Sequence, residues 1–108
     1  MRNIQQLQDG AAKEHQKADS LRNDAEKNRQ RADDSADAPQ VAQPFANTAQ
    51  KYETKAAEHD QAAMKLEEEA KQLEAKAIDL NRQKNEISIA SQAQIDRLDA
   101  EERALRGQ

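Results

Sequence analysis

The chain has 108 residues, of which 35% are hydrophobic and 35% are charged, and its formal net charge at pH 7 is −4. One Phe, one Tyr and no Trp are too few large side chains for a globular core, and the absence of cysteine excludes disulfides and thiolate metal sites. Good helix formers dominate, with only two glycines and two prolines. This composition predicts a single, extended all-α domain over residues 1–108.

Alanine recurs every seven residues in two series. The first series is Ala11, Ala18, Ala25 and Ala32, and the second is Ala49, Ala56, Ala63, Ala70 and Ala77. A strict seven-residue repeat is typical of a coiled coil, and small residues in its seam let two helix backbones approach closely. The predicted seam of the hairpin consists of Leu21, Ala25, Ala49, Tyr52, Ala56, His59, Ala63, Leu66, Ala70, Leu73, Ala77 and Leu80.

The first helix is predicted over about residues 3–37, with Ile4 and Leu7 opening its apolar stripe. Gly10 lies inside this helix and costs roughly 1 kcal/mol relative to alanine. Glu14 and Asn28 occupy positions of the repeat where a larger apolar residue is expected. The first helix is therefore expected to have an imperfect seam.

Both prolines, Pro39 and Pro44, lie between the two alanine series. Each removes an amide donor and disfavours helical geometry in the residue before it. We therefore expect a turn over about residues 38–44, with the chain reversing near residue 41 into an antiparallel hairpin. A single kinked rod is the alternative.

The second helix is predicted over about residues 44–106, because no Gly or Pro follows until Gly107. It would be roughly 90 Å long against roughly 50 Å for the first helix, which can cover it only to about Leu80. Beyond that point Lys84 replaces alanine in the repeat, and residues 81–86 are polar. We expect the second helix to project past its partner. The alternative is a three-helix bundle with a break near residues 81–86.

Bulky aliphatic residues return after the polar stretch. Because the first helix cannot reach them, they are the candidate interface for a partner or for a second copy of the chain: Ile87, Ile89, Ile95, Leu98 and Leu105.

Candidate chemistry is limited to two histidines and an acidic run. A reversal near residue 41 makes His59 face Asn23, roughly 12 Å by helical rise from His15, so the two histidines are not expected to share a metal. The run Glu67 to Glu69 is interpreted as a solvated helix face, with attraction of a basic partner as the alternative. We expect no catalytic, cofactor-binding or metal-binding residues, and hence no enzyme.

Several partner classes are excluded on composition. The chain has no block of Lys and Arg for nucleic acid and no run of about twenty apolar residues for a membrane. A rod of helices also offers no pocket for a small-molecule substrate. The N-terminal residues do not resemble a signal peptide, which predicts a cytoplasmic protein unless a signal-less route exports it.

At the predicted turn the chain reads Phe45-Ala46-Asn47. In length, hairpin form and turn position it is similar to the W-x-G helical-hairpin substrates of specialised secretion systems, which carry Trp-x-Gly at this place. Both defining residues of that family are replaced here, so the resemblance implies a hairpin shape and no function.

Two functional hypotheses follow from these patterns. The first is a non-enzymatic structural or assembly protein that self-associates, as a homodimer, and contacts other proteins. The alternative is a small acidic helical binding module, such as a chaperone, adaptor or inhibitor of the kind found in phages and mobile elements, that docks on a larger protein machine.

Overall fold

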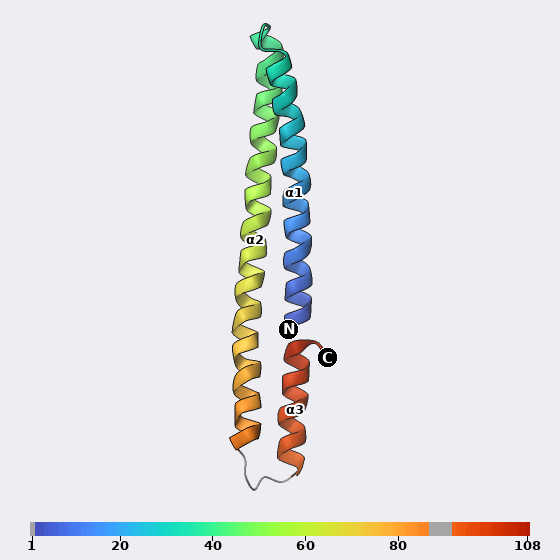
Figure 1. The fold of residues 1–108 in the computed structure, drawn as a ribbon, viewed down its shortest axis with the longest axis vertical. Coiled ribbons are helices and arrows are strands. Elements are labelled where there is room, and N and C mark those ends of the chain that lie inside the picture. Colours follow the sequence, from blue (N-terminus) through green and yellow to red (C-terminus); the bar gives the residue numbers. More distant parts are fainter. Residues whose placement is uncertain (1, 87–91) are drawn as a thin grey trace. The chain divides into compact units, whose positions relative to one another are not determined.

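The computed structural model describes residues 2–86 and 92–108. These residues form three helices and no strand: α1 spans Ile4–Asp34, α2 spans Pro39–Glu86 and α3 spans Gln92–Arg106 (Figure 1). The predicted all-α class is confirmed. Contacts within the chain divide it into two units, which we name the hairpin unit (residues 12–63) and the three-helix unit (residues 1–11 and 64–108).

Helix α1 begins at a reciprocal cap. The side-chain oxygen of Asn3 accepts a hydrogen bond from the Gln6 amide at 2.8 Å, and the Gln6 side-chain oxygen accepts one from the Asn3 amide at 3.0 Å. This arrangement satisfies two amides that have no carbonyl partner in the first helical turn. The sequence Asn-x-x-Gln therefore accounts for the start of α1 at Ile4.

The turn between α1 and α2 is shorter and earlier than predicted. Helix α2 begins at Pro39, which occupies a first-turn position where its missing amide costs nothing. Pro44 lies inside α2, and the amide that it lacks would have bonded the Gln40 carbonyl in the first turns of the helix, where water can replace it. The predicted loop over residues 38–44 is therefore wrong, because both prolines are tolerated close to a helix N-terminus.

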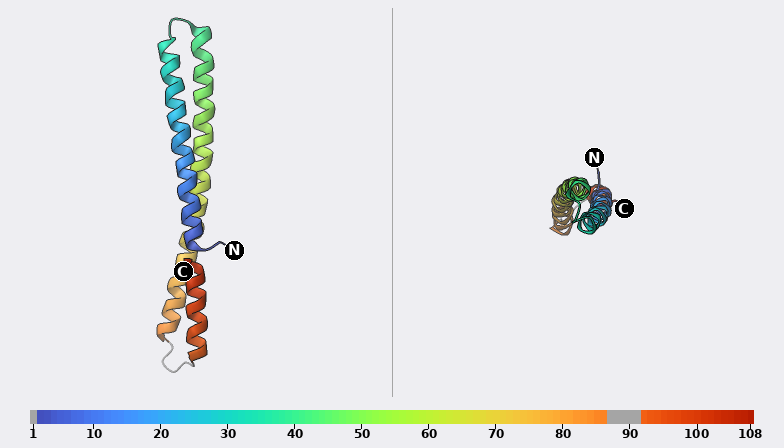
Figure 2. Two further views of the ribbon diagram at one scale, coloured as in Figure 1. Left: turned by 90° about the vertical axis from the view of Figure 1, so that its right-hand side faces the viewer. Right: turned by 90° about the horizontal axis from the view of Figure 1, so that it is seen from above.

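In the hairpin unit, α1 and α2 run antiparallel side by side (Figures 1 and 2). Leu21 and Tyr52 are half-buried beside a line of alanines. These alanines are almost completely buried, with exposed fractions of 0–2%: Ala18, Ala25, Ala49, Ala56 and Ala63. Because alanine projects only a methyl group, the two backbones lie close together along this line.

Two contacts between the helices define the register of the hairpin unit. The Nδ1 atom of His59 lies 2.5 Å from a carboxylate oxygen of Glu14, and Nδ1 of His15 lies 3.1 Å from one of Asp60. His59 therefore faces Glu14 and not Asn23. The prediction was wrong because the chain reverses between α1 and α2 before Pro39, and moving a turn shifts the facing residue by twice that amount.

The three-helix unit contains an apolar cluster built from α1 and α2. Ile4 and Leu7 from the start of α1 pack with Ala70 of α2, and Leu66 and Leu73 pack against this cluster. Leu66 also lies over the backbone of α1, since a Cβ atom added at Gly10 would be 3.2 Å from Leu66 Cδ1. The glycine inside α1 thus makes room for a leucine of α2.

Helix α3 returns antiparallel along the end of α2 (Figure 1). Arg106 bonds Glu74, and Lys84 bonds both Asp99 and Glu102, so residues late in α3 pair with residues early in this stretch of α2. The predicted continuous, projecting second helix is wrong. The folded-back alternative describes α3 better, although α2 stays helical through residues 81–86, where the break was predicted.

The end of α3 meets the start of α1 within the three-helix unit. Gly107 has φ +90°, and an added Cβ there would lie 2.8 Å from Asn3 Oδ1. The amides of Gly107 and Gln108 both donate to the Arg103 carbonyl at 2.9 Å, which closes α3 with a left-handed glycine cap. Along the alanine seam of α2, the N-terminal part of α1 is therefore replaced by α3 as the packing partner between Ala70 and Ala77.

Candidate interaction surface

Lys84 occupies the next position of the heptad after Ala70 and Ala77, and it anchors α3. Its side chain is only 15% exposed, and its ammonium donates to Asp99 and, at 3.0 Å, to Glu102. Asp99 and Glu102 are three residues apart, so both lie on the same face of α3. The hydrogen bonds that Lys84 donates, first to Asp99 and second to Glu102, raise the pKa of Lys84 above its usual value, and the bond from Lys84 lowers the pKa of Asp99.

A second ion pair holds the C-terminal end of α3. The Nη1 atom of Arg106 lies 2.9 Å and 3.1 Å from the two carboxylate oxygens of Glu74 on α2. Ala77 of α2 lies between Glu74 and Lys84 and is fully buried, and Leu98 of α3, next to Asp99, is 8% exposed. Charged contacts in the middle and at the C-terminal end of α3, together with these buried apolar residues, thus fix α3 on α2.

A groove of about 580 Å³ is lined by residues of both α2 and α3. Its lining is mostly apolar in area: Ala75, Lys76, Asp79, Leu80, Glu101, Ala104 and Leu105. Leu80 and Leu105 are half-buried, whereas the three charged residues are exposed. Two helices cannot enclose a leucine on every side, so part of each leucine remains open in this groove.

The predicted interface residues have different surroundings. Leu98 is buried within the single chain, Ile95 is half-buried, and Leu105 lines the groove. Ile87 and Ile89 lie outside the described residues. Contact of these residues with a partner stays a prediction.

Sequence reasoning assigned no contact or role to four charged residues of this region: Lys76, Lys84, Asp79 and Glu101. The signal for Lys84 was available, because a lysine at an alanine position of the repeat needs a carboxylate partner when it is buried. Asp99 and Glu102, spaced three residues apart, are such a partner pair. The groove charges carry no comparable sequence signal.

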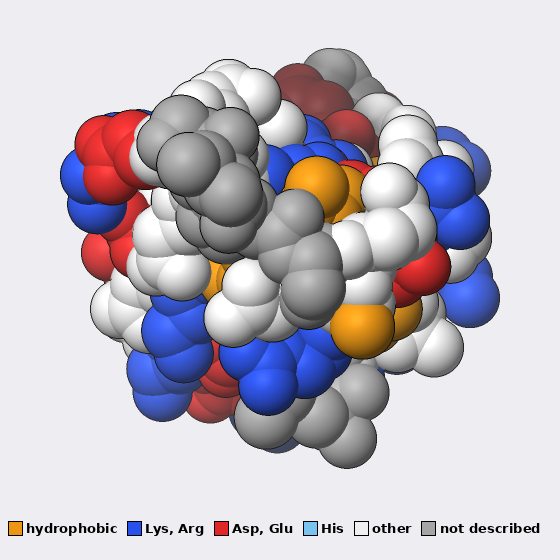
Figure 3. All heavy atoms as spheres, turned by 90° about the horizontal axis from the view of Figure 1, so that it is seen from below, with side chains coloured by type: hydrophobic (Ala, Val, Ile, Leu, Met, Phe, Trp, Pro, Cys, Tyr) orange, Lys and Arg blue, Asp and Glu red, His pale blue; other side chains and the backbone are white. Residues whose placement is uncertain are grey.

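Other exposed large apolar residues are scattered. Among the described residues they are Val41, Met64 and Ile78, which are 50–65% exposed. Seen along the long axis from below, hydrophobic side chains form small separate areas between charged ones (Figure 3). Single exposed apolar residues are ordinary on a protein surface and do not define a docking site. The groove differs because its leucines come from two helices and share one hollow.

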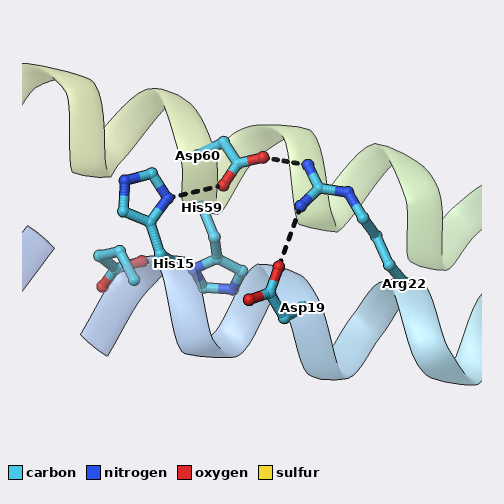
Figure 4. Close-up of polar contacts among 6 residues, drawn as sticks. His15, Asp19, Arg22, His59 and Asp60 are labelled. Carbon is cyan, nitrogen blue, oxygen red and sulfur yellow. Dashed lines mark hydrogen bonds and ion pairs between the residues drawn. The ribbon is translucent and has the colours of Figure 1, made fainter. Parts of the chain in front are cut away.

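The hairpin unit carries a chain of charges across its two helices (Figure 4). Asp60 of α2 lies between His15 and Arg22 of α1, and Arg22 also bonds Asp19 at 3.4 Å. The hydrogen bond from Arg22, followed by that from His15, lowers the pKa of Asp60, and Asp60 raises the pKa of Arg22. These contacts tie the middle of α1 to α2.

The other breaks in the apolar pattern also find partners. Glu14, which replaces an apolar residue of α1, pairs with His59 of the α2 seam, and this hydrogen bond lowers the pKa of Glu14. Arg29 bonds both oxygens of Glu53 at 2.6 Å. Asn28 is buried and donates to the Asp24 carbonyl one turn earlier. The Glu14–His59 and Arg29–Glu53 pairs thus specify the register between the helices, whereas the Asn28 bond lies within α1.

Within residues 2–86 and 92–108, no group of three or more His, Asp or Glu side chains is arranged to hold a metal ion. In the same part of the chain, no helix has the length and apolar character to cross a membrane. Comparison with protein-family models, with curated proteins and with solved structures finds no match to this chain.

Proposed function

We propose that this chain is a non-enzymatic structural or assembly protein that acts by self-association, as a homodimer, and through contacts with other proteins. One observation supports the proposal above all: the groove on the α2–α3 pair has an apolar floor that includes Leu80 and Leu105, both only half-buried in the single chain. An apolar hollow with charged residues at its edge is the usual form of a helix-docking surface.

The energetics favour covering this groove. Fully burying a leucine side chain stabilises by roughly 1.5–3 kcal/mol relative to exposure. A two-fold contact uses the same patch on both copies, so each groove residue is buried in both of them. The rest of the α2–α3 seam contributes little, because alanine exposes little area to be buried. Self-association therefore supplies apolar burial that a single chain lacks.

Sedimentation equilibrium over micromolar to submillimolar concentrations tests the proposal. The wild-type chain should sediment as a reversible dimer. Leu105→Asp should weaken the dimer because it places a carboxylate on the groove floor. Met64→Asp, the matched change at an exposed residue outside the groove, should associate like the wild type. A wild-type chain that remains monomeric throughout the range contradicts the proposal.

The alternative function, an acidic helical binding module, also has an observation in its favour. Glu67, Glu68 and Glu69 are all exposed on α2, and Arg2 lies 3.7 Å from Glu69. Such a module would bind a basic protein with an affinity that falls steeply with salt. Capture of a basic partner from the native host, lost in the triple variant with Gln at these positions, would favour this function over self-association.

A further inference from the structure

The charges around the groove are arranged unevenly. Lys76 and Asp79 lie three residues apart on α2, so both face the groove, and Glu101 lies on the opposite edge, on α3. Asp79 is held along α2 by Arg82 at 2.6 Å and by Gln83 at 2.9 Å. The groove therefore presents the ammonium of Lys76 on α2 and two carboxylates, Asp79 on α2 and Glu101 on α3.

Resting on the proposed self-association, we infer that the groove is occupied by α2 of a second copy in an antiparallel two-fold contact. Lys76 of each copy then lies between Asp79 and Glu101 of the other. A two-fold contact is reciprocal, so this pairing forms twice.

The direction of the contact follows from the charges. If two α2 helices met in parallel about a two-fold axis, each residue near the axis would face its own copy, and Lys76 would lie against Lys76. In the antiparallel arrangement the two α2 helices run in opposite directions. Lys76 of one copy then lies opposite Asp79 of the other, so unlike charges meet. Like charges placed opposite each other at an interface are unfavourable, which selects the antiparallel arrangement.

The shape of the groove suits a helix. Ala75 on α2 and Ala104 on α3 are exposed groove residues with only a methyl group, so neither blocks the approach of another backbone. Leu80 and Leu105 supply the apolar floor against which the incoming helix packs. The same α2 surface serves as groove edge in one copy and as inserted helix in the other.

A charge-exchange experiment tests the pairing. Lys76→Glu places a glutamate against two carboxylates, and Asp79→Lys with Glu101→Lys places Lys76 against two ammonium groups. Each variant alone should dimerise at least about ten-fold more weakly than the wild type. An equimolar mixture should form a heterodimer with an affinity near that of the wild type, because both junctions again join opposite charges.

Matched controls carry the same changes of charge outside the groove: Lys65→Glu, and Glu58→Lys with Glu68→Lys, all at exposed positions. These should associate like the wild type, separately and mixed, and circular dichroism checks that every variant remains helical. If the wild type dimerises but the groove variants dimerise equally well, or their mixture does not recover, the inferred pairing is wrong and the proposed function stands. A monomeric wild type overturns both and leaves the groove to a different protein.

Discussion

At the scale of single residues, the size of one side chain sets the distance between helices. The buried alanines of the hairpin unit leave no space for a longer side chain, since Ala18, Ala49 and Ala63 are fully buried. The polar exceptions are equally specific, because Glu14 and His59 satisfy each other across the helices. Small residues therefore determine how closely α1 and α2 approach, and polar residues determine the register between the two helices.

Overpacking this line of alanines should destabilise the chain. Ala63→Leu adds three carbon atoms at a fully buried position, and forcing such a group into a packed seam costs about 1–3 kcal/mol. Urea unfolding followed by circular dichroism measures the change. The same substitution at exposed Ala57 should be nearly silent. Equal effects at both positions would show that the helices are not closely packed at Ala63.

The carboxylates of Glu14 and Asp60 predict a loss of stability in acid. Their pKa values are lowered from 4.5 and 3.8 by hydrogen bonds from His59 and from Arg22 with His15, respectively. Between the ordinary and the lowered pKa values, the unfolded chain therefore binds more protons than the folded chain. The free energy of unfolding falls as the pH drops from the ordinary pKa values toward the lowered pKa values of the folded chain. The contribution is fully present above about pH 5.

Urea unfolding between pH 7 and pH 2 measures this dependence. A variant with Glu14→Gln and Asp60→Asn should be less stable than the wild type at pH 6 and should lose less stability on acidification. A control with Glu58→Gln and Glu68→Gln, both at exposed positions, should keep the wild-type slope. An unchanged slope in the first variant would rule out these two carboxylates as its source.

At the scale of elements, α2 of the three-helix unit packs first with the start of α1 and then with α3. Ile4 and Leu7 of α1 cover Ala70, whereas α3 covers the stretch from Glu74 to Lys84. The glycine cap at Gly107 ends α3 beside Asn3, the capping residue of α1. The carbonyl end of one helix thus lies near the amide end of the other, which is the favourable order for two helix dipoles.

Removing the Lys84 ammonium should release α3. Lys84→Met keeps the length of the side chain but removes the ammonium that bonds Asp99 and Glu102. The two carboxylates then lose their attraction to α2 and are better solvated when α3 is undocked. Amide hydrogen exchange should show reduced protection across Gln92–Arg106. Arg82→Met is the matched control, because Arg82 is exposed and bonds Asp79 and Glu86 within α2. Unchanged protection in Lys84→Met would show that apolar packing alone holds α3.

At the scale of the whole molecule, the chain has little apolar side chain to bury. Hydrophobic residues make up 35% of the sequence, and among residues 2–86 and 92–108 most of the buried hydrophobic residues are alanines. The ordering of each residue costs about 1–2 kcal/mol of conformational entropy, which such a core offsets only narrowly. Association is therefore expected to contribute to the stability of the fold.

Heat denaturation at different protein concentrations tests this expectation. Because a dimer is stabilised by mass action, the melting temperature should rise with concentration for the wild type. The Lys76→Glu variant should melt at a lower temperature with a weaker concentration dependence, and Lys65→Glu should behave like the wild type. A melting temperature independent of concentration would show that the single chain is stable by itself.

Much of the fold could be predicted from the sequence because it depends on local properties. Helix-forming composition and the scarcity of Gly and Pro indicated the all-α class, and the seven-residue repeat located the alanines that are buried. The two prolines located the reversal to within a few residues. These features act over one or two helical turns, so they can be recognised in a single sequence.

Only the tertiary structure decided what depends on residues far apart in the chain. The position of the reversal before Pro39, rather than near residue 41, changed every facing pair, including His59 with Glu14. The partner of Lys84 lies on a helix that the sequence assigned to one continuous rod. The groove exists because α3 returns along α2, which joins Leu80 to Leu105 and Lys76 to Glu101. Such pairings arise from the small differences in burial between alternative packings, and no local pattern of residues reports them.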